Sequence, residues 1–284
     1  MPLHIPKFWA SATASARNPR GEDVPLRCFG HADSGIAEAR GNALEILSRL
    51  TERVRAGAPW PERYGYGDRP IREEILRELR SPSHSPDGYV TRNGYGAAIL
   101  NSASVLFADI DDVPLGFVAR VRRLFGGGAS SATPDEVPDS ITAFAAAHPT
   151  WTLRVYRTYA GWRVLALHGV FDPESQATIE ALRAMGSDPQ YVRLTTVQKC
   201  FRARLTPKPW RCGVARPQRV FPREDPLVEQ DHARWCAAYE AACRQYATCR
   251  FVTELGRSRR CADAERIVAI HDEATRAEES LPLA

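Results

Sequence analysis

Residues 151–168, Trp-Thr-Leu-Arg-Val-Tyr-Arg-Thr-Tyr-Ala-Gly-Trp-Arg-Val-Leu-Ala-Leu-His, contain two runs rich in apolar and aromatic residues, separated by a short turn. Such runs are typical of β-strands, and the glycine at position 161 suits the turn between them. The stretch therefore predicts a strand over 151–158 and a second strand over 162–168, joined at 159–161.

The elements on either side of this strand pair complete a β-α-β-β-α-β order. This order is typical of the ferredoxin-like split unit, so the expected fold is α+β with a palm-like core. In that topology the first strand lies beside the third, antiparallel, at the centre of the sheet. The remaining predicted elements are strand 104–110, helix 114–124, the Gly126–Gly128 loop with short helix 139–147, helix 174–186 and strand 190–195.

Further elements are expected to flank this core. The first thirty residues show no period and are predicted to run over the surface. Apolar spacing then predicts a helix that starts after Asp33-Ser34 and ends near Gly57, and a second helix over 71–80. The Asn93-Gly94 dipeptide indicates a hairpin between short strands at 89–91 and 97–100.

The last part of the chain is predicted to be mainly helical. Amphipathic patterns cover 225–246 and 262–276, with Phe251-Val252 between them. The expected organisation is an N-terminal helical region over 1–88, an α+β core over 89–223 and a C-terminal helical extension over 224–284 packed on the core.

Two carboxylates at the end of the first core strand are the main candidates for chemistry. In Ser-Val-Leu-Phe-Ala-Asp-Ile-Asp-Asp, residues 104–112, Asp109 and Asp111 share one face because side chains alternate along a strand. Mg²⁺ or Mn²⁺ would relieve their repulsion and bind substrate phosphates. The alternative interpretation is a strand end that leads into a turn and helix cap, which we prefer for Asp112.

The expected topology also places a cation beside these carboxylates. Arg163, at the start of the third core strand, is predicted to lie next to Asp109 and Asp111. It would act either as a structural ion pair or as a phosphate ligand that works with the metal.

A basic block extends from Gln190 to Arg223. It holds nine cations and no acidic residue, so with a chain total of +4 the rest of the sequence carries −5. Such a block is the footprint of a polyanion, either nucleic acid or a nucleoside triphosphate. Arg binds phosphate bidentately and Lys acts as a point charge. The nine are Arg193, Lys199, Arg202, Arg204, Lys208, Arg211, Arg216, Arg219 and Arg223.

Two other segments have both a functional and a structural interpretation. The segment 156–163 combines aromatic residues with Arg157 and Arg163. On an open sheet face this combination would stack and bind bases; the alternative is that the aromatic side chains bury area in the core. His168 is a candidate general acid or triphosphate ligand, or an ordinary strand-end histidine. His271-Asp272 is interpreted as part of a solvated helix face.

Several classes of protein are excluded by what the sequence lacks. It has no run of 18 apolar residues and no signal-peptide pattern at its start, which predicts a cytoplasmic protein with no membrane partner. Its seven cysteines include no Cys-x-x-Cys pair, which argues against zinc. No phosphate-loop, Gly-x-Gly-x-x-Gly or Gly-x-Ser-x-Gly motif is present.

Residues 90–215 resemble the archaeo-eukaryotic primase superfamily, or primase-polymerases. The resemblance rests on the Asp-x-Asp strand, the strand pair with a glycine turn and the later Arg-Leu-Thr-Pro-Lys-Pro segment. It implies nucleotidyl transfer on a palm-like sheet, with a Gly-x-His strand and a third carboxylate. This chain has Gly161-Trp162-Arg163 and Arg193 at those places, and Asp188 is the nearest replacement carboxylate. The stretch 201–213 is also similar to one in uncharacterised bacterial proteins, a likeness that implies no activity.

Three functions follow from these observations. The first is a metal-dependent nucleotidyltransferase in which Asp109 and Asp111 hold the ion, while Arg163, Arg202, Arg204 and Lys208 position the triphosphate. The second is a catalytically inactive protein that binds nucleic acid or a nucleotide through the same surface. The third is a metal-dependent nuclease or phosphodiesterase. The sequence does not indicate the oligomeric state.

Overall fold

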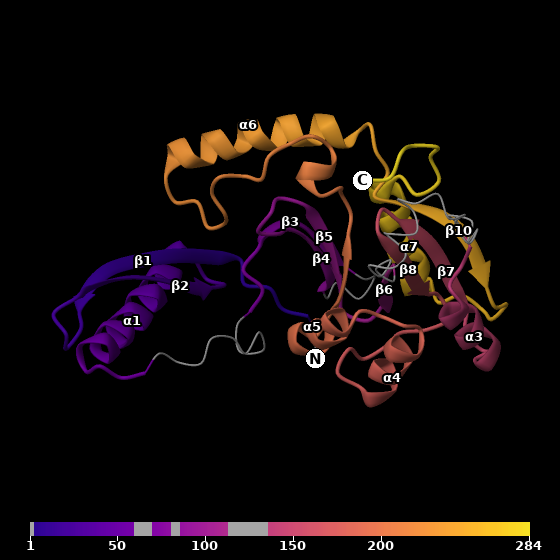
Figure 1. Ribbon diagram of the computed structural model, residues 1–284, viewed down its shortest axis with the longest axis horizontal. Coiled ribbons are helices and arrows are strands. Elements are labelled where there is room, and N and C mark those ends of the chain that lie inside the picture. The colour runs from indigo at the N-terminus through magenta and orange to yellow at the C-terminus, as the bar shows by residue number, and fades with distance from the viewer. Residues whose placement is uncertain (1–2, 60–69, 81–85, 113–135) are drawn as a thin grey trace, which may run out of the picture. The chain divides into compact units, whose positions relative to one another are not determined.

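The computed structural model describes residues 3–59, 70–80, 86–112 and 136–284 of the chain. These residues form two compact units, each assembled from two separate segments. The first unit comprises Met1–Asn101 and Lys208–Ala242, and the second comprises Ser102–Pro207 and Cys243–Ala284. Helices and antiparallel sheets occur together (Figure 1), so the expected α+β class is confirmed.

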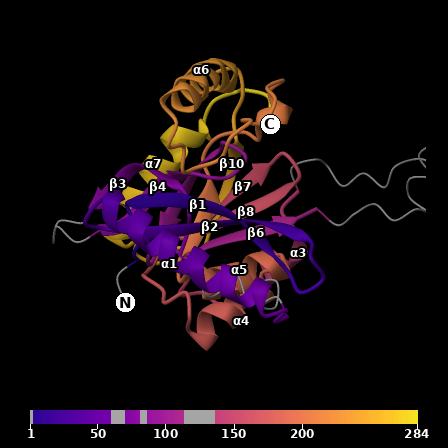
Figure 2. The same cartoon turned by 90° about the vertical axis from the view of Figure 1, so that its left-hand side faces the viewer.

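The first unit begins with a long antiparallel hairpin. Strands β1 (Phe8–Arg17) and β2 (Asp23–Ala32) pair along their whole length, and helix α1 (Ile36–Arg55) packs on them (Figure 2). The first thirty residues, expected to show no period and to run over the surface, thus contain most of a regular hairpin. The buried positions of the hairpin are mainly alanines, which allow α1 to pack closely on the strands. Alanine is only weakly hydrophobic, so the alternation of apolar and polar residues that predicts a strand is hard to recognise here.

Three more strands and a long helix complete the first unit. Strands β3 (Glu74–Arg80), β4 (Pro86–Arg92) and β5 (Ala98–Ser102) are neighbours in that order, and the expected Asn93-Gly94 turn joins the last two. The helix predicted over 71–80 was wrong, because pairing with β4 overrides the helical propensity of Glu-Ile-Leu-Arg-Glu-Leu. The short helix η1 (Pro209–Arg211) and helix α6 (Pro226–Cys243) follow.

The second unit is built on a sheet with the strand order β10-β7-β8-β6. Strands β6 (Phe107–Asp111) and β8 (Gly161–Ala166) are antiparallel, and β7 (Leu153–Thr158) pairs with β8 as expected. The expected pairing of 104–110 with 162–168 is thus confirmed. The central position expected for the first strand was wrong, since β6 ends this order and β10 (Cys249–Leu255) extends the sheet beside β7.

Helices account for much of the rest of the second unit. The bounds of α3 (Asp139–Ala147), α4 (Gln176–Ala184) and α7 (Ala262–Thr275) are close to the predicted ones. The strand predicted over 190–195 was wrong, because these residues form α5 (Pro189–Gln198). The side chain of Asp188 caps α5 and Pro189 occupies its first turn, a helix-start signal that outweighs the strand-like Tyr-Val-Arg-Leu-Thr run. A short strand, β9 (Phe201–Arg204), follows.

Some predicted elements lie outside the described residues, namely helix 114–124 and the Gly126–Gly128 loop. The region 1–88, expected to be helical, contains α1, β1, β2, β3 and the start of β4 in its described part. Within the residues that the structure describes, none of the helices is long and apolar enough to cross a membrane.

The contact between β6 and β8 depends on the small size of Gly161. A Cβ atom at this position would lie 2.2 Å from the carbonyl oxygen of Ile110 and 2.9 Å from the Cα of Asp111. We expect Gly161→Ala to lower the free energy of unfolding by about 1–3 kcal/mol, because the two backbones would have to separate. Urea unfolding checks this. Gly169→Ala, where an added Cβ meets nothing within 4 Å, is the matched control and is expected to change little.

Candidate functional site

Asp109 and Asp111 lie at the end of β6 and face the same side of the sheet. Their cross-strand partners are Arg163 and Gly161, so the expected proximity to the 161–163 segment is confirmed. The Asp109 side chain is 45% exposed, and Asp111 is exposed as well. Two accessible carboxylates therefore stand two residues apart on one edge of the sheet.

Arg163 provides a fixed positive charge beside this pair. Its side chain is only 4% exposed, and its Nη1 donates a hydrogen bond of 2.9 Å to the carbonyl oxygen of Arg204. Its Nη2 lies 3.7 Å from Oδ1 of Asp109, which is an ion pair but too long for a hydrogen bond. Among the described residues, no side chain forms a hydrogen bond to the Asp109 carboxylate. That carboxylate therefore keeps its oxygens available to a ligand.

The start of α5 braces the strand that carries the carboxylates. The backbone N–H of Asp188 donates to the carbonyl oxygen of Asp109 at 3.0 Å, and the hydroxyl of Tyr191 donates to that of Phe107 at 2.9 Å. Burial, followed by the negative charge of Asp109, raises the pKa of Tyr191, so it remains a protonated donor at neutral pH. Tyr191 was not predicted as a site residue, and nothing in its local sequence marks it.

A buried polar network lies behind Arg163. The Nε2 of His271 is 3.2 Å from Nη1 of Arg163, and its Nδ1 is 2.8 Å from Oδ1 of Asp272. The Asp272 carboxylate also accepts hydrogen bonds from the Tyr156 hydroxyl at 2.6 Å and from Nη2 of Arg154 at 2.7 Å. Through His271, these contacts fix the Arg163 guanidinium next to the carboxylates.

This network corrects the interpretation of 271–272 as a solvated helix face. His271 is fully buried, and the side chain of Asp272 is only 13% exposed. The buried residues Ala264, Ile267, His271 and Thr275 recur at helical spacing, a pattern that could have identified His271 as an inward position. Asp272 follows it and reaches Arg154 and Tyr156 on β7.

The network predicts a loss of stability in acid. Burial, aided by the charge of Arg163, lowers the pKa of His271 to about 4 from 6.5. Burial alone would raise the pKa of Asp272, but hydrogen bonds from His271 and Tyr156 and the charge of Arg154 lower it. Both groups therefore bind protons more readily in the unfolded chain. The stability linked to His271 is lost as pH falls from 6.5 through 4, and the stability linked to Asp272 is lost as pH falls below 3.8.

Unfolding measured in urea between pH 7 and pH 4 tests this expectation. His271 should contribute about 3 kcal/mol of the loss, at about 1.4 kcal/mol for each unit of pKa difference. His168 and His232, whose pKa values burial also lowers, add to the same trend. The His271→Phe variant should show a shallower dependence on pH, and His4→Gln, at an exposed position, should not. Equal slopes in all three proteins would contradict the assignment.

The carboxylate pair fits the way in which proteins hold Mg²⁺ or Mn²⁺. Mg²⁺ usually binds one or two carboxylates together with substrate phosphates and water, rather than a complete cage of protein ligands. Asp109 and Asp111 supply hard oxygen ligands on one face, and Arg163 supplies a cation for phosphate. Across the described ranges, no group of three or more His, Cys, Asp or Glu side chains is placed to hold an ion.

Two residues predicted to bind nucleotide or nucleic acid, Arg157 and His168, have structural contacts with other residues of the second unit. Arg157 forms a bidentate pair with Asp112, with both distances 2.8 Å, and also donates to the carbonyl oxygen of Gly161. His168 lies beyond the opposite end of β8 from Gly161 and packs against Trp151 and Phe171. Neither prediction as a nucleotide ligand is supported by this geometry.

The aromatic residues of the strand pair belong to the core. Tyr156 is fully buried and Trp162 is 5% exposed, so neither presents a free face to a base. The ring of His271, on α7, lies 4.8 Å from that of Tyr156 and 5.6 Å from that of Phe107. Helix α7 therefore covers the sheet face that was expected to be open, and the structural interpretation of these aromatics is the correct one.

The basic block is divided between the two units. In the second unit, Arg204 contributes its carbonyl to Arg163, while Arg202 donates to Gln198 and Lys199 pairs with Glu174. Arg193 is exposed on α5 and lines a hollow of about 580 Å³ with Arg183.

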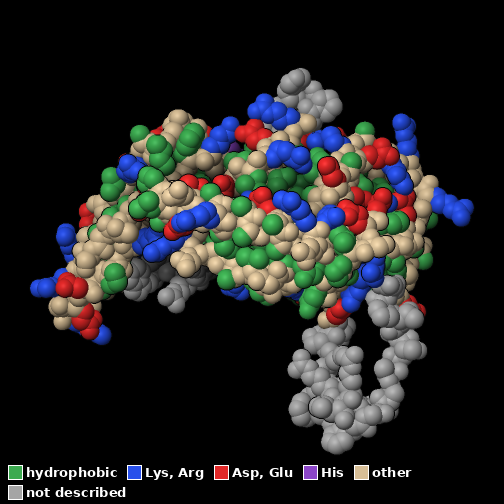
Figure 3. Space-filling model, turned by 90° about the horizontal axis from the view of Figure 1, so that it is seen from above, with side chains coloured by type: hydrophobic (Ala, Val, Ile, Leu, Met, Phe, Trp, Pro, Cys, Tyr) green, Lys and Arg blue, Asp and Glu red, His purple; other side chains and the backbone are tan. Residues whose placement is uncertain are grey.

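The remaining cations of the block belong to the first unit. Arg223 is 4% exposed and pairs with Glu74 and Glu229, so acids from other elements neutralise part of the block. Lys208 and Arg211 flank the exposed Trp210, and the Lys208 Nζ lies 5.7 Å from the centre of its ring. On the face displayed in Figure 3, basic and acidic side chains are intermixed.

Comparison with known proteins assigns no relative, since no protein-family model, curated protein or solved structure matches this chain.

Proposed function

We propose that this protein is a Mg²⁺- or Mn²⁺-dependent nucleotidyltransferase that acts on nucleoside triphosphates or nucleic acid. The observation that carries the proposal is the pair of accessible carboxylates, Asp109 and Asp111, on one face of β6 beside the buried guanidinium of Arg163. Carboxylates that can share a hard cation, next to a cation that can take phosphate, suit phosphoryl chemistry.

In this account each residue has a limited and testable role. Asp109 and Asp111 hold the ion, which when bound neutralises charge on the triphosphate. Arg163 is pre-positioned by Arg204 and His271, so little side-chain ordering remains to be done when phosphate binds. Asp188 and Tyr191 keep the end of β6 in place through backbone carbonyls.

A second candidate function is nucleotide or nucleic-acid binding without catalysis. Two observations favour it: the described residues supply no third carboxylate ligand, and the ion pair with Arg163 already compensates part of the charge of Asp109. The two candidates share a surface and differ in whether a metal ion confers turnover.

Incorporation of labelled nucleotides on a primed template separates these candidates. With Mg²⁺ or Mn²⁺ the transferase should extend the primer, and chelation of the metal should stop extension. A parallel reaction without nucleotides follows shortening of the same primer, which would identify a metal-dependent nuclease or phosphodiesterase instead. Binding of the template with neither extension nor shortening would support the non-catalytic candidate and overturn the proposal.

A further inference from the structure

A hollow of about 500 Å³ in the first unit, apart from the carboxylate pair, has the properties of a ligand site. It lies between α6 and the segment 215–219, and its lining includes Arg216, Gln218, Arg219, His232 and Trp235. Pockets that hold small molecules have volumes of roughly 300–1,000 Å³. The volume is therefore sufficient for a nucleotide.

The aromatic wall of the hollow is rigid. Trp235 stacks with His232 and with Tyr239 at interplanar angles of 18°, and its indole N–H donates to the carbonyl oxygen of Ala215 at 2.8 Å. Gly96 of the β4–β5 turn approaches so closely that a Cβ there would lie 2.1 Å from the Trp235 ring. The indole is thus fixed before any ligand arrives, which lowers the entropic cost of stacking.

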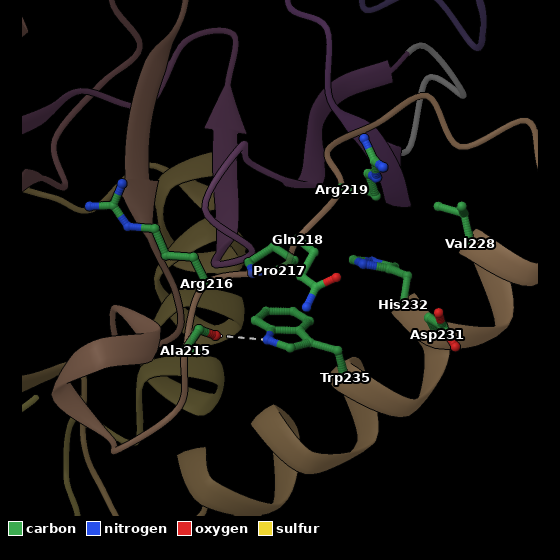
Figure 4. Close-up of a pocket in the computed structure, with 9 residues that line it drawn as sticks. All are labelled: Ala215, Arg216, Pro217, Gln218, Arg219, Val228, Asp231, His232 and Trp235. Atoms are coloured by element: carbon green, nitrogen blue, oxygen red, sulfur yellow. Dashed lines mark hydrogen bonds between the residues drawn. The ribbon is translucent and has the colours of Figure 1, made fainter.

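Polar side chains around the hollow have few hydrogen bonds and ion pairs in the described part of the chain. His232 is 7% exposed, and its Nδ1 has no hydrogen-bond partner there, although its Nε2 lies 3.3 Å from Sγ of Cys236. Neither Arg216 nor Arg219 has an ion pair with a described residue, and Gln218 has no side-chain hydrogen bond with one. Figure 4 shows His232 and Trp235 directed from α6 toward the segment, with the Gln218 amide between them.

The surroundings of Arg216 indicate the chemistry of that ligand. Its guanidinium lies 4.3 Å from the centre of the Trp210 ring, and Trp210 is 44% exposed. A positive rim beside flat aromatic rings is the combination by which proteins bind a base and its phosphate.

From these contacts we infer that the hollow binds a nucleoside phosphate, with the base at the His232–Trp235 wall, the phosphate on Arg219, and the charge of Arg216 at the rim beside the exposed Trp210. The Gln218 amide provides hydrogen bonds for the edge of the base. The inference rests on the proposed function, because the carboxylate site and the hollow would both bind a nucleotide. This nucleoside phosphate is either a free nucleotide or one nucleotide of a single-stranded nucleic acid.

The test is binding in EDTA, which keeps it independent of the carboxylate pair. ATP is titrated by calorimetry, and a fluorescent twelve-residue oligo-dT is titrated by anisotropy. We expect at least one of them to bind the wild type, and Arg216→Gln/Arg219→Gln to weaken that binding about tenfold or more. If the ligand is the strand, the variant should also flatten the dependence of log K on log salt by about 1.4, the value for two lost phosphate contacts. Arg49→Gln/Arg55→Gln on α1 makes the same charge change and should bind as the wild type does.

Two further variants separate this inference from the proposed function. The Asp109→Asn/Asp111→Asn protein should still bind in EDTA, even if it has no activity. Gln218→Ala should weaken ATP or oligo-dT but not inorganic triphosphate. The inference is overturned if neither probe binds the wild type, if the Arg216/Arg219 variant binds as well as the control variant, or if triphosphate alone binds as tightly as ATP.

Discussion

Replacing Asp272 with alanine is expected to lower the free energy of unfolding by about 3–5 kcal/mol. The carboxylate accepts hydrogen bonds from Tyr156, Arg154 and His271, and all three lie in a region that water reaches poorly. Without Asp272 a buried hydroxyl, an imidazole and most of a guanidinium lose their common acceptor, and each unpaired group carries its own desolvation cost. Glu278, which also pairs with Arg154, is too exposed to replace it.

Urea unfolding at pH 7 measures this effect, and Asp272→Asn provides the graded comparison. Asparagine keeps one acceptor oxygen but turns a donor toward the other partners, so its loss should be intermediate. Glu278→Gln, at the exposed end of the same cluster, should cost less than about 1 kcal/mol. A loss below 1 kcal/mol for Asp272→Ala would show that the network does not stabilise the fold.

The Asp109→Asn/Asp111→Asn protein is expected to lose metal-dependent turnover almost completely and to remain folded. Neutral amides are poor ligands for Mg²⁺ in place of carboxylates, while removal of two like charges relieves repulsion on β6. Because the ion pair of Asp109 with Arg163 is loose, and Arg204 and His271 still hold Arg163, the free energy of unfolding should change by less than about 1 kcal/mol.

Nucleotide incorporation together with thermal melting checks both parts of this expectation. Asp112→Asn is the matched control, because that neighbouring carboxylate pairs with Arg157 and takes no part in the proposed site. The control should keep its activity. A double variant that is destabilised by 1–3 kcal/mol, when the wild type gains nothing from Mg²⁺ or nucleotide, would show that the pair is structural.

The strand pair at the centre of the second unit could be predicted from sequence because every local signal agrees there. The run 153–158, the turn at Gly161 and the run 161–166 combine β propensity with a suitable turn, and the ferredoxin-like order then places Arg163 opposite Asp109. Helix α3 was predicted correctly for a similar reason, since it is short, apolar on one side and bounded by Pro138 and His148.

Other elements could not be predicted because tertiary contacts decide them. The alanine-rich hairpin β1–β2 is stabilised by α1 packed on it, a partner that local patterns do not reveal. Helix α5 differs from these, because its start signal, Asp188 followed by Pro189, is present in the sequence and outweighs the strand-like run 190–195.

The candidate site was only partly predictable. The carboxylate pair follows from the alternation of side chains along one strand, which is a local property of the chain. The position of Arg163 follows from the ferredoxin-like order, which pairs β6 with β8. The contacts of Arg157 and His168 depend on the residues that the fold brings close to them. Arg157 pairs with Asp112, and His168 packs against Trp151. The buried network around Asp272 joins residues more than a hundred positions apart, so no local pattern could assemble it.

The most direct test of the proposed function is uptake of Mn²⁺ in the presence of a non-hydrolysable nucleoside triphosphate, followed by electron paramagnetic resonance. The wild type and Asp112→Asn should bind Mn²⁺ saturably and alike, and Asp109→Asn/Asp111→Asn should bind it at least about tenfold more weakly. Equal uptake by all three proteins, or none by the wild type, would contradict the assignment of Asp109 and Asp111 as the metal site.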